Sequence, residues 1–141
     1  MRRLLNIGNG YKLKYLKRTL DLIMMGFQND SSELFIHAVC FFRAFKKGKL
    51  LFTSSDLYRP KSEGNESFDW TSPGATIFDK CVEKHNSILN ELILLKIQTK
   101  GKDLELTFEK GIKFQMLIDT TEEEEKIRVF SDNEEILVIY S

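Results

Sequence analysis

The stretch LELTFEKGIKFQMLI, residues 104–118, decides the fold. Apolar and polar side chains alternate through 104–109 and again through 112–118, as in a β-strand with one buried face. The Lys-Gly pair at 110–111 suits the tight turn of a β-hairpin. Burying the apolar set contributes about 10 kcal/mol or more before entropy is counted. That set is Leu104, Leu106, Phe108, Ile112, Phe114, Met116 and Ile118.

Further strand patterns lie on both sides of this hairpin. The run 93–97 predicts a strand before it, and 127–131 with 135–140 predicts a last hairpin that turns at 132–133. The acidic run 122–125, between the hairpin over 104–118 and the strand over 127–131, is expected to form a solvated break. The C-terminal half is therefore expected to form an antiparallel meander.

The N-terminal half is less regular. Residues 33–45 are almost continuously apolar, which predicts a central strand covered on both faces, and 50–55 would be its hairpin partner. The segment 11–27 mixes two periods, because leucines recur at helical spacing while 11–15 alternate. It fits either a short helix that runs into a strand or one long strand.

One main helix is expected over residues 75–90, where the apolar side chains recur at spacings of three, four and seven. The resulting fold class is α+β. Six to seven mostly antiparallel strands form one sheet, and the helix packs on one face of it.

The size and composition of the chain are those of an ordinary globular domain. Its 141 residues, of which 42% are hydrophobic, predict a single domain over 1–141. Cys40 and Cys81 lie in apolar surroundings and are expected to be buried free thiols in a reducing compartment. The sequence shows no signal-peptide pattern and no run long enough to span a bilayer, so we expect a cytoplasmic protein.

Few residues are placed as catalysis or metal binding requires. Cys81 and His85 are four residues apart on the expected helix, and His37 and Cys40 are close on a strand, but no CxxC or HxxxH pattern supports a zinc site. Cys40 is too apolar in its surroundings for a reactive thiolate. We therefore expect no metal, no cofactor and no enzymatic activity.

The loop over residues 54–74 leaves an alternative open. A small enzyme or ligand-binding protein would need a cleft under this loop in which Asp56, Asp69 and His37 converge. The competing interpretation is that the two aspartates only cap turns. We expect residues 61–67 to be mobile and both ends of the loop to be anchored on the sheet.

Charge is distributed unevenly along the chain. The first fifty residues hold 10 Lys/Arg against 3 Asp/Glu, although the net charge of the whole chain is zero. Lysines interleave with tyrosines over 11–18, a pattern that could follow a nucleic-acid backbone. Nucleic-acid-binding domains are usually basic overall, so a nucleic-acid partner is not expected.

Several short motifs together resemble a family of small bacterial proteins that look like the immunity proteins encoded beside secreted toxins. These are H-x-x-C-x-x-R at 37–43, S-x-D at 54–56, one central Trp, D-L-x-L-x-F at 103–108 and E-x-I-R at 125–128. The last motif has Ile127 where the family has Trp, and Lys102 stands where a glycine is usual.

The resemblance implies a non-catalytic role, in which the chain binds a toxin domain as its protein partner and blocks it. The lack of a run long enough to span a bilayer predicts no membrane partner, and a homo-oligomer stays open. We expect Arg43 to pair with Asp56, with Arg128 joining them or covering Trp70. The structural or interaction candidates are His37, Arg43, Asp56, Trp70, Asp79, Arg128, Glu122, Glu123, Glu124 and Glu125.

Overall fold

The computed structural model describes residues 2–61, 67–132 and 134–141. The elements in chain order are β1 (Arg2–Leu4), β2 (Lys12–Thr19), β3 (Leu22–Gln28), β4 (Glu33–Ala38), β5 (Phe41–Lys46), β6 (Lys49–Thr53), the 3-10 helix η1 (Ser54–Tyr58), α1 (Ile77–Lys84), α2 (Asn86–Leu89), β7 (Leu94–Lys100), β8 (Asp103–Phe108), the 3-10 turn η2 (Glu109–Gly111), β9 (Ile112–Leu117), β10 (Glu125–Ser131) and β11 (Glu134–Tyr140).

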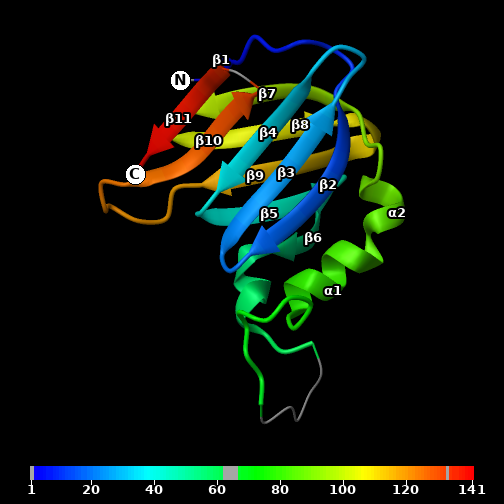
Figure 1. Cartoon of the computed structure of the whole chain (residues 1–141), viewed down its shortest axis with the longest axis vertical. Coiled ribbons are helices and arrows are strands. Elements are labelled where there is room, and N and C mark those ends of the chain that lie inside the picture. Colours follow the sequence, from blue (N-terminus) through cyan, green and yellow to red (C-terminus); the bar gives the residue numbers. More distant parts are fainter. Residues whose placement is uncertain (1, 62–66, 133) are drawn as a thin grey trace.

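The strands form two antiparallel sheets that lie face to face (Figure 1). Sheet A has the order β1-β7-β8-β9-β5-β6, and sheet B has the order β11-β10-β4-β3-β2. The expected class is confirmed: the fold is α+β, with mostly antiparallel strands and one main helix. The strands divide between sheets of six and five, where the sequence indicated one sheet of six to seven.

The hairpin over 104–118 forms as predicted and lies in the middle of sheet A. β8 and β9 pair with Leu104 opposite Met116 and Leu106 opposite Phe114. Alternate side chains of the inner strands of both sheets enter one shared core, where the rings of Phe27 from sheet B and Phe108 from sheet A stack at 6.2 Å. Alternation therefore predicted the buried face correctly.

The segment 11–27 is a β-hairpin, so both interpretations of it were wrong. Leu20 has a φ of 56°, and the chain reverses there between β2 and β3. A β-bulge between Leu13 and Tyr15 adds one residue to β2, so Leu13 and Leu16 both face the core although they are three apart. The bulge thus imitates the spacing of a helix.

The expected single strand over 33–45 was also wrong. It is divided at Val39–Cys40 into β4 of sheet B and β5 of sheet A. The Val39 N–H donates to the carbonyl of Lys126 (2.8 Å) at this crossing. The run is continuously apolar although neither strand is buried on both faces. Phe41 and Phe45 are only half-buried on the outer face of sheet A, whereas Phe42 and Ala44 between them face the core.

The expected helix over 75–90 forms as α1 and α2, which meet at His85. Phe78 of α1 is buried, and its ring contacts Phe42 and Phe52 edge-on at 6.5 and 5.4 Å. In Figure 1 the helices lie beside β2 and β6 at one end of the two sheets. Strand β1, which the sequence did not predict, pairs with β7 at an edge of sheet A.

Candidate functional site

The expected pair of Arg43 and Asp56 is not formed. Arg43 lies on the outer face of sheet A and donates from Nη2 to Oε1 of Gln115 (2.6 Å). Asp56 lies in η1, where its carboxylate accepts from the Thr53 N–H (3.0 Å) and from Arg59 Nη1 (2.9 Å). The predicted pair with Arg43 does not form because Asp56 already accepts from Thr53, in the capping box of η1, and from Arg59.

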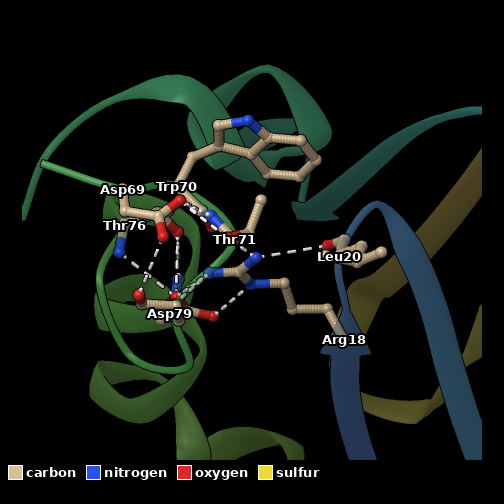
Figure 2. Close-up of polar contacts among 8 residues, drawn as sticks. Arg18, Leu20, Asp69, Trp70, Thr71, Thr76 and Asp79 are labelled. Carbon is tan, nitrogen blue, oxygen red and sulfur yellow. Dashed lines mark hydrogen bonds and ion pairs between the residues drawn. The ribbon is translucent and has the colours of Figure 1, made fainter.

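Trp70 is held by a different arginine, Arg18 at the end of β2 (Figure 2). The guanidinium donates from Nη1 to the carbonyls of Trp70 (2.7 Å) and Leu20 (3.2 Å) and from Nη2 to the carbonyl of Ser72 (3.0 Å). Nε and Nη2 also form a two-pronged pair with Asp79, at 2.9 and 2.7 Å. All five N–H groups are therefore used, and the Arg18 side chain is only 3% exposed.

Asp79 connects this arginine to the start of α1. It is the third residue of the helix and forms a capping box with Thr76, whose hydroxyl accepts from the Asp79 N–H. Burial raises the pKa of Asp79, but hydrogen bonds from Arg18 and Thr76 outweigh it and hold the pKa below its usual value. The arrangement fastens the loop to sheet B and leaves no donor of Arg18 for a ligand.

The ends of the 54–74 loop are anchored, as predicted. Leu57 is buried beneath η1, and the Tyr58 ring meets Trp70 edge-on at 5.0 Å. Asp69 caps its own turn by accepting from the N–H and hydroxyl of Thr71 (3.0 and 2.6 Å). The prediction for residues 61–67 lies largely outside the described residues.

A cleft of about 200 Å³ lies beneath η1, where two of the crossings between the sheets, from β4 to β5 and from β9 to β10, meet. Cys40 lines it, but burial raises the pKa of this thiol to about 12, so the thiol is protonated at neutral pH. The cleft hypothesis required Asp56, Asp69 and His37 to converge, and none of the three lines this cleft. The two aspartates cap local structure, and His37 lies on sheet B.

His37 and Arg128, two of the candidates, lie directly opposite each other on β4 and β10. Both point to the outer face of sheet B, since their chain neighbours are buried. Arg128 pairs with Glu125 (2.6 Å) and approaches Glu135 (3.9 Å). The expectation that it joins Asp56 or covers Trp70 was therefore wrong. Burial and the charges of Arg128 and Lys17 lower the pKa of His37.

Half-buried aromatic rings run across this face in one line. Tyr15, Gly26, Phe35 and Phe130 are successive cross-strand neighbours on β2, β3, β4 and β10. Phe35 and Phe130 stack at 5.3 Å, and His37 meets Phe130 edge-on at 5.0 Å. A side chain at position 26 would collide with the Tyr15 ring, so glycine lets that ring rest on β3. We call Tyr15, Phe35, His37 and Phe130 the aromatic strip.

The glutamates Glu122–Glu125 lie beside this face, in the crossing from β9 to β10 and at the start of β10. All four are exposed. Glu124 pairs with Lys126 (2.6 Å), and Glu125 pairs with Arg128. Residues 122–135 contain seven acidic against two basic residues, so this edge of sheet B remains acidic.

The described residues contain no group of three or more His, Cys, Asp or Glu placed to hold a metal ion. Within the same ranges, no helix has the length and apolarity needed to cross a membrane. Comparisons with protein-family models, curated proteins and solved structures found no match. The functional conclusion therefore rests on the geometry of the two outer faces.

Sequence reasoning pointed to His37 and Arg128 but missed the other members of their surroundings. Phe130 follows the buried Val129 and lies in a strand whose alternation places it opposite the core, which was a usable signal. Tyr15 carried no such signal, because alternation groups it with the buried Leu13 and only the bulge between them turns it outward. Arg18 carried no such signal, because its partner Asp79 is 61 residues away.

Proposed function

We propose that this chain is a non-catalytic protein-binding module, an immunity-type inhibitor that binds a bacterial toxin domain and occludes it. The aromatic strip is the observation that carries the proposal. Its four rings lie half-buried on a rigid sheet rather than in the core. Tyrosine, phenylalanine and arginine are enriched in protein–protein interfaces relative to the rest of a protein surface, and this patch contains all three.

The acidic charges at the β10–β11 end of the strip favour a basic partner. The edge formed by 122–135 is acidic, and complementary charge accelerates association with a basic surface. Nuclease toxins have basic active sites because they bind phosphates. The resemblance to immunity proteins supports the same partner class.

The direct test is copurification of the chain with the product of the neighbouring gene, followed by titration calorimetry. We expect Phe35→Ala and Phe130→Ala each to weaken this complex by about 30-fold, as loss of an interface anchor does. Leu51→Ala is the control, because it removes a half-buried apolar side chain from β6 of sheet A, outside both the aromatic strip and its surroundings.

A toxin that binds all three variants equally would contradict the use of the aromatic strip. A long secreted protein encoded next to the chain would agree with the proposal, whereas metabolic enzymes in that position would count against it. Thermal unfolding of each variant checks that lost binding does not reflect lost folding.

A further inference from the structure

The outer face of sheet A carries a chain of hydrogen bonds that crosses four strands. Arg43 of β5 donates to Gln115 of β9 (2.6 Å), and Gln115 donates from Nε2 to Glu105 of β8 (3.2 Å). Gln98 of β7 donates to the other oxygen of Glu105 (3.1 Å). The four residues are direct cross-strand neighbours, so the sheet itself holds them in line. We call them the polar ladder.

Arg43 ends the ladder with most of its donors unused. Its guanidinium lies between two rings of its own strand, 5.9 Å from the centre of Phe41 and 5.2 Å from that of Phe45. Its bond to Gln115 is the only one it makes within the described residues, and its Nε is buried without a partner there. The rings fix the plane of a guanidinium that still has N–H groups to donate.

The charges of this face do not balance. Glu105 accepts from both glutamines of the ladder and lies 3.5 Å from Lys113, while Asp103 accepts from the Ile118 N–H. The acids are thus satisfied within the sheet. The exposed Lys96 and Lys100 share this face by register, and no acid pairs with them in the described ranges.

A hollow of about 460 Å³ lies next to Arg43 at the turn end of the same face. Lys47 and Lys113 line it together with Phe45 and Gln115. The hydroxyl of Thr107 is buried at this hollow and has no hydrogen-bond partner among the described residues. The hydroxyl is itself inaccessible, so the two ammonium groups of Lys47 and Lys113 are the groups at this hollow that suit a carboxylate.

We propose that the outer face of sheet A is a second binding surface, on which Arg43 and the adjacent hollow take carboxylates of an acidic segment of a partner protein. A single-stranded nucleic acid fits less well, because its bases need free aromatic faces and Arg43 already lies against Phe41 and Phe45. This surface is separate from the aromatic strip and stands whether or not the strip binds a toxin.

The test uses a fluorescein-labelled hexaglutamate peptide and fluorescence anisotropy with the full chain. We expect Arg43→Gln and Lys113→Gln each to weaken peptide binding by about fivefold or more, as loss of a charge-assisted bond does. Lys17→Gln is the matched control, since it removes one positive charge from the outer face of sheet B and should change the affinity by less than about twofold.

Three results would overturn the inference. One is no measurable peptide binding by the wild-type chain, and another is an equal loss in Lys17→Gln, which would indicate unspecific charge attraction. The third is tighter binding of a labelled oligothymidine that depends on Arg43, which would assign the face to nucleic acid. Lys113 is 44% exposed, so Lys113→Gln remains informative if Arg43→Gln does not fold.

Discussion

Arg18 of sheet B and Arg43 of sheet A hold their guanidinium groups in opposite ways. Arg18 donates all five N–H groups, to a carboxylate and three backbone carbonyls, and joins β2 to the loop and to α1. Arg43 makes one bond to Gln115 in the described part of the chain and otherwise lies against two rings. One arginine is saturated, and the other is mostly unused.

The difference separates a structural role from a binding role. A buried cation that satisfies every donor internally stabilises the fold and has nothing left for a ligand. A cation whose plane is fixed but whose donors are free gains hydrogen bonds only when a partner supplies acceptors. The same substitution at the two positions should therefore have opposite consequences for stability and for binding.

The largest effect is expected for Arg18→Met. The change leaves Asp79 without its cation and frees the carbonyls of Trp70 and Ser72, so we expect a loss of about 2–4 kcal/mol in the free energy of unfolding. Urea denaturation measures it, and trypsin should then cleave faster after Lys61. Lys17→Met, on the exposed side of the same strand, should cost less than about 0.5 kcal/mol.

If Arg18→Met and Lys17→Met were equally stable, the loop anchor would not contribute to the fold. Unchanged cleavage after Lys61 would show that the loop is held by other contacts.

A smaller effect is expected for Asp79→Asn, about 1–2 kcal/mol at neutral pH, because the amide keeps the shape but loses the charge. The folded pKa of Asp79 is lowered, so its contribution is present above the unfolded pKa and is lost as pH falls through the folded value. The difference in stability between the two proteins should therefore stay constant from about pH 7 to 5 and shrink between about pH 4 and 3. A difference that does not shrink below about pH 4 would contradict the pairing with Arg18.

The fold could be predicted wherever one physical signal acted alone. Alternation and a Lys-Gly turn specified the hairpin over 104–118, and six of the seven expected side chains are buried, whereas Ile118, just after β9, is only partly buried. Prediction failed at the bulge between Leu13 and Tyr15, which imitates helical spacing, and at Val39–Cys40, where the chain changes sheets without Gly or Pro. Both failures occur where the register shifts without a change in composition.

The candidate site was predicted less completely. His37 and Arg128 were named as candidates, but that they lie opposite each other on one face of sheet B was not predicted, because strand pairing is not encoded in local alternation. The pairing of Arg43 with Asp56 was wrong, because hairpin adjacency says nothing about the competing cap at Thr53. The bond between Arg18 and Asp79 depends on how the loop folds back onto sheet B, which no local pattern encodes.

The smallest stability effect is expected for Arg43→Met. This substitution tests directly whether Arg43, unlike Arg18, is unimportant for the stability of the fold. The substitution removes one bond to Gln115 but also removes a buried Nε that has no partner in the described ranges, and methionine can still pack between Phe41 and Phe45. We expect less than about 1 kcal/mol of lost stability in urea denaturation. A loss as large as that of Arg18→Met would place Arg43 in the fold's structural framework. A small loss of stability together with hexaglutamate binding weakened by about fivefold or more would mean that its free donors serve a partner.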